Sequence, residues 1–312
     1  MISLKSKIYV SGHKGLVGSA IVRQLKSRGY KNIICKTRKE LDLTNQNKVF
    51  VFLKKTKPDF IFLAAAKVGG IYSNNKYKAD YIYENLSIQT NIIHSAYLCG
   101  IKNLIFLGSS CVYPRNCKQP IKEKYLLTGK LEKTNDAYAI AKIAGIKMCE
   151  SYNLQYNTNY KCLMPTNTFG PNDNYDTFNS HFLPALLKKI YEIKKYNKSE
   201  IKLWGNGLAR REIVYVDDIA DACLFFMKKK TVDHLINIGT GKDYTIKQYV
   251  QMLLKILIPN KKIKIKYDLS KPNGTPKKVL DIGLAKKYGW KPKSNLKKAI
   301  ELTYKDFVRK KI

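Results

Sequence analysis

A tyrosine and a lysine four residues apart, Tyr138 and Lys142, are the residues of this 312-residue chain best suited to proton transfer. Residues at this spacing lie on one face of a helix, so the phenol hydroxyl and the ammonium can point to the same place. A nearby cation favours phenolate over phenol. We therefore expect Tyr138 to donate and accept protons close to neutral pH.

The spacing alone is not specific, because the chain holds 22 tyrosines and repeats the spacing at Tyr72/Lys76, Tyr191/Lys195 and Tyr267/Lys271. Only Tyr138 follows, by about thirty residues, a serine-rich segment at the end of an apolar run. That run, over 103–107, is predicted to be a strand that ends in Gly-Ser-Ser-Cys-Val-Tyr-Pro at 108–114. Its context, more than its spacing, selects the Tyr138 pair.

A glycine-rich turn lies between a predicted strand at 7–11 and an amphipathic segment that runs to about residue 28. The turn consists of Gly12, His13, Lys14, Gly15, Leu16, Val17 and Gly18. Glycines allow the backbone to approach a ligand closely, and a helix N-terminus offers free amide groups to a pyrophosphate. The order strand, turn, helix favours a dinucleotide site over an ordinary glycine-rich turn.

Arg38 indicates which dinucleotide would bind. It follows the second predicted strand, at 32–36, where an acidic residue would hold the ribose hydroxyls of NAD. A guanidinium instead pairs with a 2′-phosphate, so the sequence favours NADP.

Strands alternate with helices through the first 165 residues, which predicts an α/β fold with a Rossmann-type, doubly wound parallel sheet. Further strands are expected at 59–66, 161–164, 213–216 and 235–238, and long helices at 76–99 and 136–156. We expect a cofactor-binding domain at 1–165, with returning segments near 213–240, and a smaller, interleaved substrate domain over most of 166–312.

Composition limits the other classes of function. The chain is 45% apolar and 26% charged, which is typical of a globular protein, but its net charge is +35. Lysines are scattered through every segment, so we interpret the charge as a solvated surface and expect no nucleic-acid partner. A silent nucleotide- or RNA-binding protein on the same scaffold remains an alternative that the charge alone favours.

Seven cysteines, without close pairs of metal-ligand spacing, predict neither a disulfide framework nor a metal site. No apolar run approaches the ~18 residues of a membrane-spanning helix. We therefore expect a cytoplasmic protein with no membrane partner.

Several longer motifs are specific enough to indicate a family. They are Gly-His-Lys-Gly-Leu-Val-Gly at 12–18, Ala-Ala-Ala-Lys-Val-Gly-Gly at 64–70, Gly-Ser-Ser-Cys-Val-Tyr-Pro at 108–114, Tyr-Ala-Ile-Ala-Lys-Ile-Ala-Gly at 138–145, Pro-Thr-Asn at 165–167, Gly-Thr-Gly at 239–241 and Lys-Pro-Asn-Gly-Thr-Pro at 271–276. With them, the chain resembles the extended short-chain dehydrogenase/reductase family over essentially its whole length. Within that family it resembles the enzymes that epimerise a GDP-4-keto-6-deoxy sugar at C3 and C5 and reduce it at C4.

The resemblance implies a reduction site formed by Ser109, Tyr138 and Lys142. NADPH would deliver a hydride to C4 of a 4-keto sugar while Tyr138 protonates the oxygen. Ser109 would hold that oxygen, and Lys142 would tune Tyr138 and bind the nicotinamide ribose. Further cofactor contacts implied by the resemblance are Leu107, Gly108, Ser110, Pro165, Thr166, Asn167, Thr168 and His181.

Epimerisation requires one group to remove a proton and another to return one on the opposite face. By resemblance these are Cys111 as base and His181 as acid. The alternatives are a buried cysteine that acts as a small hydrophobe and a histidine that caps its helix.

The resemblance also implies that a GDP-sugar binds and that two copies of the chain pair through the helices at 76–99 and 137–157. The nucleotide sugar would contact Lys189, Trp204, Arg211 and Asn273. A pure C4 reductase of a related GDP-sugar, such as a 6-deoxy-4-keto heptose, is the nearest alternative, because one extra hydroxymethyl group changes only a few contacts.

Overall fold

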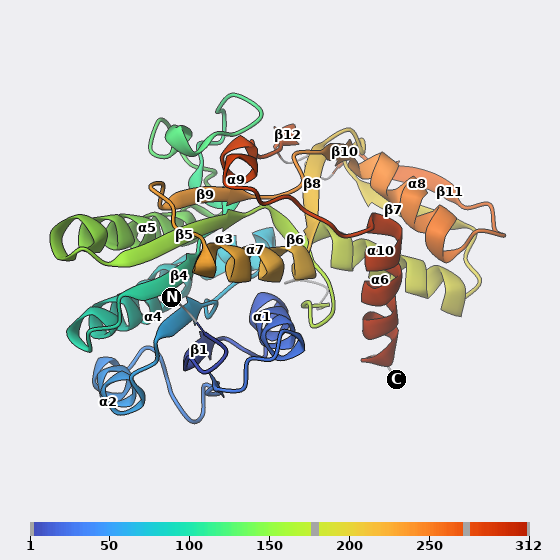
Figure 1. The fold of residues 1–312 in the computed structure, drawn as a ribbon. Helices are drawn as coiled ribbons and strands as arrows, with labels where there is room; N and C mark the ends of the chain where they lie inside the picture. The colour runs from blue at the N-terminus through green and yellow to red at the C-terminus, as the bar shows by residue number, and fades with distance from the viewer. Residues whose placement is uncertain (1–2, 176–180, 271–274, 311–312) are drawn as a thin grey trace.

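A six-stranded parallel sheet forms the centre of the molecule (Figure 1). The computed structural model describes residues 3–175, 181–270 and 275–310. The strand order is β2-β1-β3-β4-β5-β9. The strands are β1 (Ile8–Ser11), β2 (Ile33–Ile34), β3 (Phe60–Leu63), β4 (Asn103–Leu107), β5 (Asn159–Pro165) and β9 (Leu235–Ile238). Most are short, continuous apolar runs, as expected for strands that helices cover on both faces.

Helices pack on both faces of this sheet. Side chains alternate between the faces, so Ile8 and Val10 join one buried cluster while Tyr9 joins the other. The first cluster includes residues of α1 (Leu16–Ser27) and α7 (Val216–Lys228). The second includes residues of α2 (Gln46–Thr56), α4 (Lys78–Leu98) and α5 (Asp136–Tyr156). The prediction of a doubly wound α/β sheet is confirmed.

The other elements gather beside the ends of β4, β5 and β9 (Figure 1). In a small second sheet, β8 (Arg210–Tyr215) pairs with β6 (Asn167–Phe169), β10 (Asp243–Thr245) and β12 (Lys277–Lys278). A parallel pair joins β7 (Glu200–Trp204) to β11 (Lys264–Asp268). The remaining helices are α3 (Ile71–Lys76), α6 (Phe182–Lys195), α8 (Ile246–Leu257), α9 (Gly283–Lys287) and α10 (Leu296–Arg309), with short 3-10 turns at Ser110–Val112 and Glu123–Tyr125.

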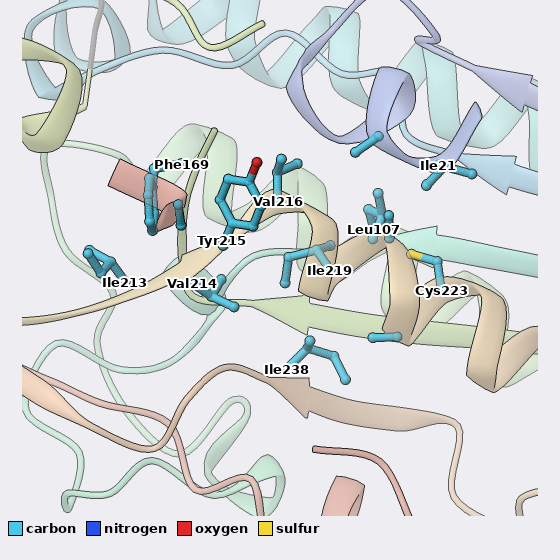
Figure 2. Close-up of a cluster of buried hydrophobic side chains, with 14 of the residues drawn as sticks. Ile21, Leu107, Phe169, Ile213, Val214, Tyr215, Val216, Ile219, Cys223 and Ile238 are labelled. Atoms are coloured by element: carbon cyan, nitrogen blue, oxygen red, sulfur yellow. The ribbon is translucent and has the colours of Figure 1, made fainter. Parts of the chain in front are cut away.

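Apolar side chains connect the two parts. Figure 2 shows Ile219 and Cys223 of α7 beside Leu107 of β4. Ile238 of β9 and Val214 of β8 belong to the same buried cluster. All belong to one buried cluster, so a shared core fixes the small sheet against the large one. In doubly wound folds, ligands bind at the carboxyl ends of the strands, and this junction lies at those ends.

Several expected boundaries differ from the structure. The strands expected at 59–66 and 213–216 are Phe60–Leu63 and Arg210–Tyr215, and the second of these belongs to the small sheet and not to the large one. The helix expected at 76–99 corresponds to α4, which begins two residues later, and a separate short helix that was not expected, α3, ends just before it at Lys76. The second strand, expected at 32–36, pairs with β1 only at Ile33 and Ile34.

The described ranges can be searched for membrane-spanning helices, metal-binding groups and disulfides. Within them no helix is long and apolar enough to cross a membrane, and no group of His, Cys, Asp or Glu could hold a metal ion. All seven cysteines fall within these ranges and are free thiols.

Candidate functional site

Tyr138 and Lys142 lie on the first turns of α5, beside the carboxyl end of β4. A side-chain hydrogen bond joins Ser109 to Tyr138. The ammonium of Lys142 lies 5.9 Å from the centre of the Tyr138 ring and donates to the Leu107 carbonyl at 2.9 Å. The structure therefore brings Ser109, Tyr138 and Lys142 together, as the sequence predicted.

The electrostatics of the pair differ from the expectation. Burial raises the pKa of Tyr138 well above its ordinary value, and the nearby Cys111 adds to the effect, while the Ser109 hydrogen bond opposes it. Burial also lowers the pKa of Lys142 to about 7. The expectation of a phenolate favoured near neutral pH is wrong for this structure, because desolvation dominates and the ammonium is directed to the Leu107 carbonyl.

Cys111 lies on the 3-10 turn that follows β4, and two donors point to its sulfur. The side-chain amide of Asn135 donates to Sγ at 3.2 Å, and the ammonium of Lys278 donates at 3.6 Å. The backbone amide of Cys111 in turn donates to the Ser109 hydroxyl at 3.2 Å. A half-buried thiol with polar donors differs from a cysteine that only fills an apolar core.

His181 is the residue that precedes α6. Its side chain makes no capping hydrogen bond to the helix, so the alternative of a histidine that caps its helix is not what the structure contains. The imidazole is exposed to solvent, yet desolvation by the surrounding protein lowers its pKa, and the ammonium of Lys278 lowers it further. Lys278 therefore contacts the sulfur of Cys111, and its charge also reaches His181.

The glycine-rich turn fits a dinucleotide. Gly12 has a φ of +72°, and a Cβ there would lie 2.8 Å from the backbone of Ala65, two residues after β3. At Gly18 a Cβ would overlap the carbonyl of Gly12. The turn must therefore be free of side chains at both points, and it leads into the 12-residue helix α1, whose first amides have no partner within the helix.

His13 in the same turn carries a buried Nδ1 atom that has no hydrogen-bond partner in the described part of the chain. Buried polar atoms are normally paired, so an unpaired one beside a glycine cradle agrees with a site for a polar ligand. Lys14, Gly15, Leu16 and Val17 complete the turn between β1 and α1.

Arg38 lies just after β2 with 72% of its side chain exposed. Its guanidinium makes an ion pair of 3.4 Å with Glu84 on α4. Glu84 makes a second, shorter ion pair of 2.5 Å with Lys67. The guanidinium is accessible, as a contact to a 2′-phosphate would require.

The expected nicotinamide contacts are located where β4 and β5 end. Gly108 donates its amide to the Leu163 carbonyl at 2.9 Å, and Ser110 is buried in the following turn. After Pro165, the side chains of Thr166 and Asn167 donate to the Glu212 carbonyl, and the Thr168 hydroxyl donates to the Thr166 carbonyl. The two bonds to Glu212 hold the segment 165–168 against β8 at the junction.

The expected nucleotide-sugar residues are distributed over the second part. Lys189 on α6 donates to the Lys202 carbonyl at 2.6 Å, two residues before the 65% exposed Trp204 at the end of β7. Arg211 on β8 donates to the Thr275 carbonyl at 2.5 Å. Asn273, the fourth expected contact, lies outside the described residues.

Sequence reasoning missed Lys278 and Asn135, the two donors to Cys111. Lys278 is separated from Cys111 by 167 residues and follows the 271–276 motif by only two. Asn135 directly precedes α5. The 271–276 motif could have indicated Lys278, but the many other lysines in this segment gave no reason to select it.

Comparison with known proteins agrees with this geometry. The NAD dependent epimerase/dehydratase family matches residues 8–239. GDP-L-fucose synthase 1 of Arabidopsis thaliana is 48% identical, over 97% of this chain and 94% of its own. GDP-L-fucose synthase of Escherichia coli (strain K12) is 44% identical, over 97% of each chain.

A solved structure of Campylobacter jejuni MlghC, a GDP-mannoheptose C4 reductase with NADP bound, is also similar. It matches with a TM-score of 0.89 and 38% identity, over 99% of this chain and 100% of that one. The chain therefore belongs to the NAD dependent epimerase/dehydratase family and is similar over nearly its whole length to GDP-L-fucose synthases.

Proposed function

We propose that this chain is an NADPH-dependent enzyme that inverts C3 and C5 of a GDP-4-keto-6-deoxy sugar and reduces its C4 ketone. The observation that carries the proposal is the position of Ser109. Its side chain is hydrogen-bonded to Tyr138 and accepts a hydrogen bond from the backbone amide of Cys111. Ser109 therefore links the phenol suited to reduction with the thiol suited to epimerisation. Relatives named GDP-L-fucose synthase support the substrate class.

Reduction adds a hydride to C4 and a proton to O4. The hydride would come from NADPH when it is bound. Tyr138 supplies the proton, and its raised pKa keeps it a phenol that holds a proton to give. Ser109 orients the ketone oxygen, and Lys142 is placed beside both Tyr138 and the end of β4, where it can bind the ribose of the cofactor.

Epimerisation precedes reduction, because only the ketone acidifies the hydrogens on C3 and C5. Cys111 takes a proton as a thiolate, the form that the Asn135 amide and the Lys278 ammonium favour. His181 returns a proton on the opposite face of the sugar. Its lowered pKa makes the imidazolium a stronger acid.

The cofactor preference rests on Arg38 and on the solved relative that holds NADP. We assign the glycine-rich turn 12–18, Arg38 and the strand ends at 107–110 and 165–168 to NADPH. Residues 1–165 with 213–240 would form the cofactor domain, and most of 166–312 the substrate domain. Lys189, Trp204, Arg211 and Asn273 would hold the GDP group, since cations and an aromatic ring suit a diphosphate and a purine.

A pure C4 reductase of a GDP-heptose is the second candidate, and similarity to MlghC favours it. Incubating the enzyme with NADPH and each 4-keto GDP-sugar in D2O, followed by NMR of the products, separates the two. We expect reduction of GDP-4-keto-6-deoxymannose with deuterium at C3 and C5. Preference for the heptose, without deuterium, would replace our proposal by the alternative.

We further propose a cytoplasmic homodimer that pairs through α4 and α5. These helices expose apolar side chains for such a pairing, including Tyr83 at 67%, Ile140 at 48% and Leu154 at 83%. Seven free thiols suit a reducing compartment. Sedimentation that gives a dimer for the unmodified chain and a monomer for Leu154→Glu would support the pairing, and a monomer in both cases would refute it.

A further inference from the structure

Lys278 is held in the site by the sheet that carries it. It is the second residue of β12, which pairs in parallel with β8 so that Lys278 lies opposite Arg211. The two residues that follow it are buried, and the Leu280 amide donates to the Glu212 carboxylate at 2.8 Å. The backbone at Lys278 is thus fixed on both sides, and its half-buried side chain has a defined origin.

The two lysines of β12 differ in what they contact. Lys277 makes an ion pair of 4.0 Å with Asp243. Lys278 instead directs its ammonium to the Cys111 sulfur at 3.6 Å. Its charge also lowers the pKa of His181 and acts on Cys117, which lies outside the proposed site. Lys277 is therefore a matched control for Lys278, with the same charge and the same strand but another partner.

We propose that Lys278 is a positioning residue for proton exchange, whose ammonium stabilises the Cys111 thiolate and opposes protonation of His181, so that one cation sets the charge state of both. The inference rests on the proposed epimerisation. It assigns to Lys278 a role through the two proton-transfer groups, without requiring that it touch the sugar.

The other groups facing the sulfur do not supply this charge. Asn135, from the start of α5, and Ser109, from the turn after β4, are neutral at every pH of interest. Tyr138 on α5 acts on Cys111, but its raised pKa keeps it neutral. Among the described residues that contact the sulfur, Lys278 is the cation. At 3.6 Å, even with the screening of bulk water, a unit charge changes a proton equilibrium by about one pH unit.

The first test measures the thiolate directly. Iodoacetamide alkylation of Cys111 in the full chain, followed by peptide mass spectrometry from pH 5 to 10, reports the thiolate fraction. We expect the midpoint in Lys278→Met to lie about one pH unit higher than in the unmodified protein, with alkylation several-fold slower at pH 7. Lys278→Arg should restore most of the difference, and Lys277→Met should match the unmodified protein. Lys278→Gln is a second neutral variant should Lys278→Met unfold.

The second test measures the pH profile of deuterium exchange into C3 and C5 of the 4-keto sugar. Because Lys278 acts on both the base and the acid, its removal should move both limbs of the profile to higher pH, whereas structural damage would lower the profile without moving it. Unmoved limbs and an unmoved alkylation midpoint, with normal exchange in the unmodified enzyme, would overturn the role of Lys278 alone. Absence of exchange in the unmodified enzyme would instead refute the proposed epimerisation.

Discussion

Arg38 should determine the choice between NADPH and NADH, and Arg38→Ala should narrow that choice by about tenfold. Charge-assisted hydrogen bonds contribute about 1.5–3 kcal/mol. The Arg38 side chain is 72% exposed and already pairs with Glu84 at 3.4 Å, so solvent and this competing carboxylate place its contribution at the lower limit. A loss of ~1.5 kcal/mol corresponds to about a tenfold change in the ratio of kcat/KM values.

The assay is kcat/KM for each cofactor, measured with the same 4-keto sugar. Lys39→Ala removes a neighbouring cation and should leave the ratio within about twofold, which separates a specific contact from the general charge of +35. Glu84→Gln should preserve or raise the preference for NADPH, because it frees the guanidinium from its ion pair. Equal kcat/KM for both cofactors in the unmodified enzyme would refute the reasoning.

Two further predictions concern stability. Burial lowers the pKa of Lys142 to about 7, so between about pH 7 and 10 the unfolded chain binds more protons than the folded chain at this group. Lys142 therefore makes folding more favourable as the pH rises through this range. Lys142→Met should remove that rise from the pH dependence of Tm, and an unchanged slope would contradict the argument. Gly18→Ala should lower the free energy of unfolding in urea by about 1–3 kcal/mol, because a Cβ there overlaps the Gly12 carbonyl. Gly15→Ala, whose Cβ would lie 3.4 Å from the same carbonyl, should cost less, and equal effects would argue against the cradle geometry.

Local patterns were sufficient to predict the sheet and to select the Tyr138/Lys142 pair near the serine-rich end of a strand. The apolar run 103–107 became β4, and the helix expected at 136–156 became α5 with the same bounds, which placed Ser109 and Tyr138 together. Such features depend on residues close in sequence, or on the regular alternation of strands and helices. The short helix α3 was not predicted, because a six-residue segment is too short for a helical pattern to be recognised in the sequence.

Properties that depend on the whole fold could not be predicted in the same way. The direction of the Tyr138 pKa shift depends on how deeply α5 is covered, which the spacing of Tyr138 and Lys142 does not contain. The approach of Lys278 to Cys111 spans 167 residues and follows from the pairing of β12 with β8. In a chain with 58 lysines and arginines, no single lysine is conspicuous before the strands are paired.

The central claim is that reduction and proton exchange use different residues of one site, and the Tyr138→Phe variant tests it most directly. With GDP-4-keto-6-deoxymannose in D2O, NADPH oxidation reports reduction, and NMR reports deuterium at C3 and C5. Loss of the phenol hydroxyl should slow reduction by ~100-fold or more, while Cys111 and His181 continue to exchange deuterium at nearly the unmodified rate. If the variant loses exchange together with reduction, or if the unmodified enzyme incorporates no deuterium, the two chemistries are not divided as we propose.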